Sequence, residues 1–100
     1  MAEYKIIYSP EVTERLEEVF NYVAGKWGLK AADDFILTFL RKIESLKTNP
    51  QIGRIAKKEN AFRSISITKH NRLYYSFIQD IIMLASLIDT RQDPAKNKFE

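Results

Sequence analysis

The sequence has no cysteine and only one histidine among its 100 residues. Without cysteine, neither a disulfide framework nor a thiolate zinc site can form, which fits a reducing compartment. One histidine cannot build a histidine-rich metal cluster. The three glycines form no phosphate-binding glycine-rich loop. The sequence therefore predicts no metal site and no organic cofactor.

Long apolar runs are also missing. The amino-terminal segment contains only three consecutive apolar residues before Ser9 and Pro10, so it does not resemble a signal peptide. No stretch approaches the ~20 apolar residues that span a bilayer. We therefore expect a soluble, cytoplasmic protein with no membrane partner. The hydrophobic content of 45% and aromatic content of 12% can supply one core, which predicts a single domain over residues 1–100.

Charge is distributed unevenly along the chain, whose net charge is +3. Residues 1–53 contain seven basic and eight acidic side chains, so residues 54–100 carry a net charge of +4. This pattern places positive potential on the second half of the molecule and favours an acidic partner there. Adjacent acid pairs such as Glu17 and Glu18 point in different directions on a helix, so we interpret them as solvated surface.

The first half of the sequence predicts a short strand and two helices. Tyr4–Tyr8 is the strand, and Ser9 followed by Pro10 is a typical helix start. An apolar stripe with helical spacing then runs to about Gly25, and a second stripe runs from Ala32 to Leu46. The break between them is short, which predicts an antiparallel helical hairpin. We interpret Trp27, in this break, as a packing residue.

The stretch from Phe62 to Arg91 predicts a three-stranded meander. Its three runs are rich in β-branched and aromatic residues, and their connections of three and two residues suit antiparallel neighbours. Alternation in the first two runs predicts one apolar face, and the third run is almost continuously apolar, as in an interior strand. The predicted class is α+β, with the hairpin packed on one face of an antiparallel sheet of three or four strands. After Arg91 the sequence is polar, which predicts a flexible tail over residues 95–100.

Basic residues gather on or beside the predicted meander, where they could hold phosphate groups. Arg91 directly follows the third run, and Asp89 is placed to orient it. Tyr74 is expected on the solvent side of the sheet beside Arg72, where it could stack on a base or pack on a partner. His70 is interpreted as a turn residue. The complete basic set is Lys57, Lys58, Arg63, Lys69, His70, Arg72 and Arg91.

The order of these features resembles the RelE/ParE superfamily of toxins from type II toxin–antitoxin systems. The likeness extends from Tyr4 to Pro94 and includes the Ser-Pro-Glu helix start and a Trp-Gly pair at the hairpin turn. Two further motifs contribute: N-P-x-I-G-R, beginning at Asn49, and D-x-R-x-D-P, beginning at Asp89. The resemblance implies a β-α-α-β-β-β fold, a bacterial cytoplasmic protein and a cognate antitoxin that neutralises it.

The superfamily divides by target, and both branches remain open at this point. RelE-like members are ribosome-dependent endoribonucleases that cut mRNA, often with a tyrosine or a His-Tyr pair near the carboxyl terminus. Neither residue follows the last predicted strand here, and the two motifs look more like ParE, which implies inhibition of DNA gyrase by binding and a role in plasmid stabilisation. A non-toxic antitoxin-binding module is a third alternative.

Each branch assigns different roles to the same side chains. A ParE-like toxin needs no catalytic residue, and its expected contacts with gyrase or its DNA are Arg63, Lys69, Arg72, Tyr74 and Arg91. A ribonuclease would need a base, an acid and groups that stabilise the charged transition state. The residues that match its basic surface are Lys57, Lys58, Arg63, Arg72 and Arg91.

Overall fold

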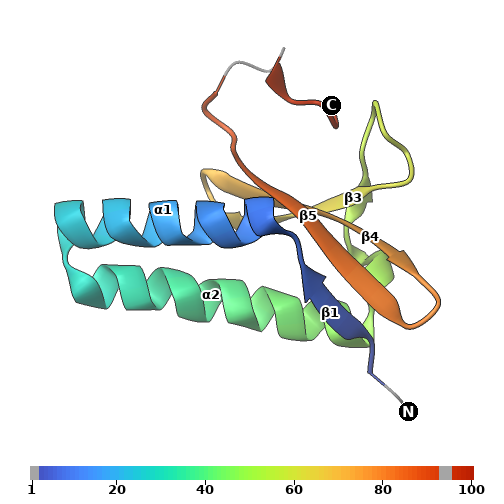
Figure 1. Ribbon diagram of the computed structural model, residues 1–100, viewed down its shortest axis with the longest axis horizontal. Helices are drawn as coiled ribbons and strands as arrows, with labels where there is room; N and C mark the ends of the chain where they lie inside the picture. Colours follow the sequence, from blue (N-terminus) through green and yellow to red (C-terminus); the bar gives the residue numbers. More distant parts are fainter. Residues whose placement is uncertain (1–2, 93–95) are drawn as a thin grey trace.

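The computed structural model describes residues 3–92 and 96–100, and Asp93 and Pro94 of the second motif lie outside this part of the chain. Two helices and five strands follow one another along the sequence (Figure 1). In chain order the elements are β1 (Lys5–Tyr8), α1 (Pro10–Trp27), α2 (Leu29–Thr48), a short 3-10 helix η1 (Pro50–Ile52), β2 (Arg54–Ile55), β3 (Arg63–Thr68), β4 (Asn71–Ile78) and β5 (Ile81–Asp89).

The strands form one mixed sheet in the order β1-β5-β4-β3-β2. The helical hairpin and the meander that the sequence predicts are both present, so the α+β fold is confirmed. The expected three or four antiparallel strands are corrected to five, because β2 adds a two-residue edge and β1 pairs with β5 in parallel. Strands β1 and β5 are separated in the sequence by the helical hairpin and by β2 to β4, so no tight turn joins them or forces them to be antiparallel.

Helix α1 begins as its sequence predicts. The side chain of Ser9 accepts a hydrogen bond from the backbone N–H of Val12, and Pro10 occupies the first helical turn. Only Gly28 separates the two helices, and its φ of 97° and ψ of 168° suit glycine far better than any other residue. Among the described residues, neither helix is both long and apolar enough to cross a membrane.

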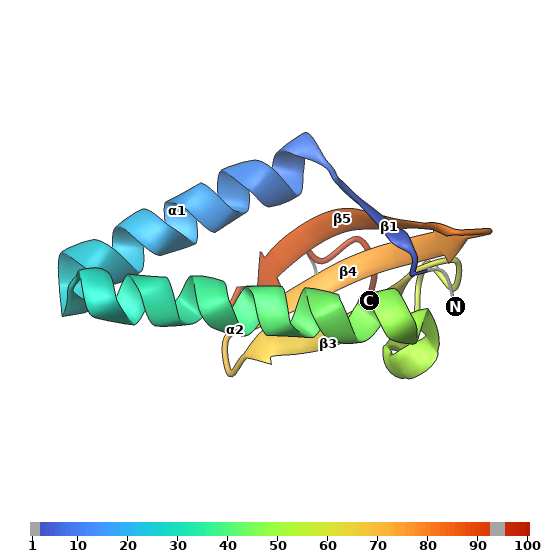
Figure 2. The same ribbon diagram turned by 90° about the horizontal axis from the view of Figure 1, so that it is seen from below.

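Both helices cover the same face of the sheet, which we call the helix face (Figure 2). The main core lies in this layer, where the stripe of α2 meets alternate residues of the strands. As predicted, Ile67, Leu73 and Tyr75 all contribute to it. The turn end of the hairpin extends past the sheet, and there Trp27 is 62% exposed, so its expected packing role is wrong.

The segment between α2 and β3 is fixed by one buried tyrosine. The hydroxyl of Tyr75 donates to the carbonyl of Pro50 at 2.6 Å and accepts from the backbone N–H of Gly53 at 2.9 Å. A Cβ atom on Gly53 would lie 2.4 Å from that hydroxyl, so only glycine fits this close approach. This contact explains the glycine of the N-P-x-I-G-R motif.

Residues 96–100 return to the other side of the sheet, which we call the open face (Figure 1). Phe99 is 3% exposed and packs in a second, smaller core with Tyr74 and Ala56. The sequence predicts flexibility for residues 95–100. Residue 95 lies outside the described part of the chain, and in residues 96–100 the buried Phe99 lies on the sheet while Lys96 and Lys98 are exposed.

Candidate functional site

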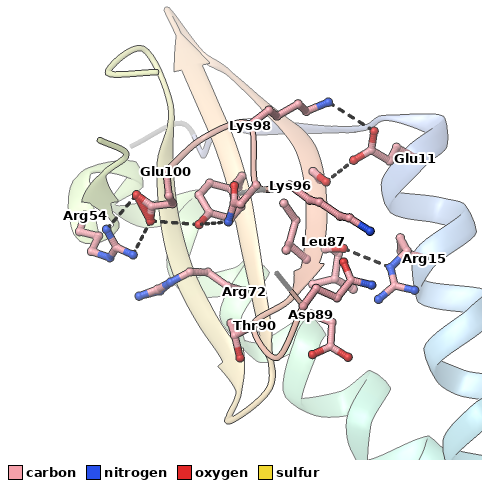
Figure 3. A pocket seen from close by; sticks show the side chains of 15 residues that line it. Glu11, Arg15, Arg54, Arg72, Leu87, Asp89, Thr90, Lys96, Lys98 and Glu100 are labelled. Carbon is pink, nitrogen blue, oxygen red and sulfur yellow. Dashed lines mark hydrogen bonds and ion pairs between the residues drawn. The ribbon is translucent and has the colours of Figure 1, made fainter. Parts of the chain in front are cut away.

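The strongest candidate site is a pocket of about 540 Å³ on the open face (Figure 3). Its walls come from the start of α1, the strands β2, β4 and β5, and residues 96–100. Five basic and three acidic side chains line it. The basic residues are Arg15, Arg54, Arg72, Lys96 and Lys98, and the acidic residues are Glu11, Asp89 and Glu100.

Arg72 is the predicted residue that lies centrally in this site. It pairs with Ile88 across the β4–β5 ladder, and its guanidinium extends toward the Arg54 side of the pocket (Figure 3). Its Nη1 atom is buried and has no hydrogen-bond partner among residues 3–92 and 96–100. A buried guanidinium N–H without an acceptor is costly, so this atom favours an incoming anion.

Tyr74 also belongs to the open face, but the expectation that it faces solvent is corrected. The side chain is 1% exposed because Phe99 stacks on its ring, with centroids 4.4 Å apart and planes 9° from parallel. Burial raises the pKa of Tyr74, so the hydroxyl stays protonated and donates to Glu100 at 3.1 Å. Tyr74 can therefore meet a partner only when Phe99 moves.

Arg63 lies on the helix face instead of the open face. It is in phase with the apolar residues of β3, and its Nη1 donates to the carbonyl of Gly53 at 2.9 Å. Its guanidinium also lies 5.9 Å from the ring centroid of Phe77. These contacts separate Arg63 from Arg72 and tie it to the loop before β2.

Arg91 is exposed at the end of β5, and Asp89 orients it as the sequence predicts. Its Nε and Nη2 atoms donate to the two oxygens of that carboxylate at 3.0 and 2.8 Å. Hydrogen bonds from Arg91 lower the pKa of Asp89 from 3.8 to about 2. These hydrogen bonds fix the direction of the Arg91 side chain. Arg91 borders a groove under the hairpin and does not line the open-face pocket.

The remaining predicted residues occupy loops. Lys57 and Lys58 are exposed after β2, and their backbone N–H groups donate to Glu100 and Phe99 respectively. Lys69 is exposed in the β3–β4 turn, where His70 also lies, so the turn interpretation of His70 is confirmed. The structure therefore distributes the predicted residues over the open face, the helix face, the end of β5 and the loops. Of these residues, Arg72 and Tyr74 line the open-face pocket.

Sequence reasoning missed Arg54, Phe99 and Glu100. Both terminal guanidinium nitrogens of Arg54 reach the Glu100 carboxylate, the nearer at 2.5 Å. Burial acts to raise the pKa of Glu100, but hydrogen bonds from Arg54, Lys57 and Tyr74 outweigh it and lower that pKa. Arg54 is part of the N-P-x-I-G-R motif, which was the available signal, whereas nothing in the tail sequence pointed to this contact.

The chemistry of the open-face pocket favours binding over proton transfer. Each acid that lines it is already held: Glu11 by Ser86 and Lys98, Asp89 by Arg91, and Glu100 by Arg54. No group of three or more potential metal ligands occurs among the residues that the structure describes. The pocket therefore offers cationic donors to an anion.

The same arrangement of two helices on a mixed sheet occurs in solved toxin structures. A structure described as a chromosomal ParDE toxin–antitoxin system from Pseudomonas aeruginosa aligns with a TM-score of 0.73, covering 86% of this chain and 95% of that one at 10% identity. The YoeB dimer of Staphylococcus aureus aligns with a TM-score of 0.62, covering 87% and 97% at 18% identity. At these identities the alignments establish the fold, which is that of the RelE/ParE toxins.

Sequence comparison then defines the family. The family model described as the ParE toxin of the type II toxin–antitoxin system parDE matches residues 6–94. Toxin ParE1 of Mycobacterium tuberculosis is 23% identical over 94 residues, which cover 93% of this chain and 96% of that protein. This chain belongs to the ParE toxin family of type II toxin–antitoxin systems.

Proposed function

We propose that this ParE-family toxin inhibits DNA gyrase by binding to it and that a cognate antitoxin neutralises the toxin. Family membership over residues 6–94 is the observation that carries the proposal. The chemistry of the open face supports it, because the acids around the pocket are held in hydrogen bonds and ion pairs instead of being free for proton transfer. In this account the toxicity stabilises the plasmid or chromosomal locus that encodes the toxin–antitoxin pair, and the toxin does not cleave nucleic acid.

The expected gyrase contacts are Arg72 and Arg91, with Lys69 at the adjacent turn. Arg91 is 58% exposed at its side chain and held by Asp89, so it can present a fixed guanidinium to a partner. Arg63 donates to backbone carbonyls within the chain, which makes it a positioning residue for the loop before β2 in this account. Tyr74 becomes a contact only after Phe99 leaves its ring.

The antitoxin is expected to cover apolar surface on the helical hairpin. A groove of about 710 Å³ lies between the hairpin and the end of the sheet, and Val19, Tyr22 and Trp27 contribute apolar walls to it. Its charged lining includes Arg15 paired with Glu18 and Arg91 paired with Asp89, so the groove offers both donors and acceptors to polar side chains of the partner. The YoeB relative from Staphylococcus aureus has been solved as a heterotetrameric complex with YefM, at a TM-score of 0.57, which supports an antitoxin partner for this chain.

Expression in bacterial cells tests this proposal. We expect growth arrest with broken chromosomal DNA, relieved when the antitoxin is co-expressed. Arg91→Ala should weaken the arrest, whereas Arg41→Ala, which removes an exposed arginine of α2, should not. Arrest accompanied by codon-phased mRNA cuts and intact DNA would instead support the RelE-like ribonuclease, and harmless accumulation of folded protein would support a non-toxic binding module.

A further inference from the structure

Residues 99 and 100 occupy the open face in a chemically specific way. The Phe99 ring lies parallel to Tyr74, and the ring of Phe62 approaches it edge-on with centroids 5.1 Å apart and planes at 68°. The backbone N–H of Lys58 also donates to the carbonyl of Phe99 at 2.8 Å. An aromatic slot between two strands and a loop is thus filled by a side chain from the same molecule.

The adjacent carboxylate fills an anion site. Glu100 accepts hydrogen bonds from the Arg54 guanidinium, from the hydroxyl of Tyr74 at 3.1 Å and from the backbone N–H of Lys57 at 3.1 Å. Three types of donor therefore converge on one acidic group, as in sites built for phosphate or carboxylate. Figure 3 shows the Glu100 carboxylate beside the Arg54 guanidinium, with dashed lines for the hydrogen bonds between them.

The site contains a cationic side chain, Arg72, that does not pair with Glu100. Arg72 lies beside Arg54, and its buried Nη1 has no hydrogen-bond partner within residues 3–92 and 96–100. Both arginines also line a second pocket of about 410 Å³, which lies at the edge of the sheet between Ser64 and Ser66 of β3 and Lys42 and Ser45 of α2. A ligand with one flat ring and one charge would leave Arg72 and this second pocket unused.

We propose that the open face is a binding site for single-stranded nucleic acid and that Phe99 and Glu100 mask it. In the bound state a base stacks on Tyr74 in place of Phe99, and a phosphate takes the donors of Glu100. The next phosphate pairs with Arg72. The nucleic acid then continues into the second pocket, beside Ser64 and Ser66 of β3. The inference goes beyond gyrase inhibition, since it concerns a site that needs no gyrase.

Several observations favour nucleic acid over an acidic peptide as the ligand. Parallel stacking on an aromatic ring suits every base, and phosphates supply one negative charge per nucleotide, which matches successive cations on a path. The pocket also carries Arg15, Lys96 and Lys98 around its rim. A peptide with a single aromatic and acidic pair needs only the contacts that Phe99 and Glu100 already make.

Masking by the same chain has a measurable consequence. An intramolecular competitor acts at an effective concentration that can reach the millimolar range, so weakening it should raise the affinity for an external ligand on the order of tenfold. Glu100→Gln removes the negative charge with little change in shape, and Phe99→Ala uncovers Tyr74. Either variant should bind more tightly than the unaltered chain.

The test is fluorescence anisotropy with a labelled single-stranded oligonucleotide and the full chain. We expect tighter binding for Glu100→Gln and Phe99→Ala, and loss of that gain when Arg72→Ala is added to either variant. Adding Arg72→Ala should also reduce the slope of log affinity against log salt concentration by about one, as expected when one phosphate contact is lost. Arg41→Ala is the matched control, because it removes an exposed arginine of α2 outside the described pocket.

Three results would overturn the inference. The first is an unchanged affinity in Glu100→Gln, whose fold is checked by circular dichroism, and the second is a gain that survives Arg72→Ala. The third is displacement of residues 99 and 100 by an acidic aromatic peptide but not by the oligonucleotide, which would assign the site to a protein partner. None of these results depends on gyrase, so the inference and the proposed function can fail separately.

Discussion

Two adjacent tyrosines show how single residues determine both faces of this molecule. Tyr75 points into the main core and fixes the loop before β2, whereas Tyr74 points to the open face and is covered by Phe99. A shift in the β4–β5 register occurs between them, so their partners on β5 are Leu84 and Ser86. Tyr75 thus stabilises the fold, and Tyr74 belongs to the candidate site.

Removal of the Tyr75 hydroxyl should destabilise the protein. Tyr75→Phe leaves the carbonyl of Pro50 and the N–H of Gly53 without their buried partner, at an expected cost of about 1–3 kcal/mol in the free energy of unfolding. Tyr22→Phe is the matched control, because Tyr22 is 52% exposed and should change stability little. Urea denaturation measures both, and equal midpoints would contradict the structural role of Tyr75.

The ion pair at the end of β5 predicts a pH effect. Because the pKa of Asp89 is lowered from 3.8 to about 2, its contribution to stability is present above pH 3.8 and is lost as the pH falls toward 2. In Arg91→Ala the pKa of Asp89 should rise toward 3.8. Carboxyl chemical shifts in an NMR titration report this value directly, and a value that stays near 2 would show that Arg91 is not the cause.

At the scale of elements, the single residue between the helices controls the hairpin. Gly28 has a φ of 97° and a ψ of 168°, so an alanine there should cost on the order of 1–3 kcal/mol in backbone strain. Gly25 lies inside α1 with no heavy atom near its missing Cβ, so Gly25→Ala should stabilise the protein by roughly 0.5–1 kcal/mol. Thermal unfolding of the two variants should therefore shift in opposite directions, and shifts of the same sign would contradict this account.

Local sequence patterns predicted most of the elements. The cap at Ser9, the two helical stripes and the alternation of β3 and β4 each depend on residues close together in the chain, so their signals are visible without the fold. The parallel pairing of β1 with β5 depends on residues more than seventy positions apart. Strand β2 contains only Arg54 and Ile55, too few residues to show a period.

The candidate site was predicted less completely because several of its contacts, like the β1–β5 pairing, join residues that are far apart in the sequence. Arg63 could have been placed correctly, because it is in phase with Ile65 and Ile67 and so belongs to the helix face. Phe99 stacks on a ring twenty-five positions earlier, and no periodic pattern in the tail indicates such a contact. Tyr74 was therefore expected in solvent, although the tail buries it.

At the scale of the whole molecule, the two faces of the sheet have different tasks. The helix face carries the main core and fixes the hairpin, while the open face carries a cationic pocket closed by residues 96–100. The hairpin also leaves a groove and an exposed tryptophan beyond the sheet. Arg91 lines this groove and is also an expected gyrase contact, so an antitoxin bound there would cover part of the surface that meets the target.

A cleavage-complex assay tests the central claim most directly. The purified chain is incubated with gyrase, supercoiled plasmid and ATP, and linear DNA is measured after denaturation and proteolysis. We expect linear DNA to accumulate, to decrease strongly with Arg91→Ala and to remain unchanged with Arg41→Ala, while thermal unfolding shows that both variants are folded. Gyrase that supercoils normally and yields no linear DNA at saturating toxin would contradict gyrase as the target.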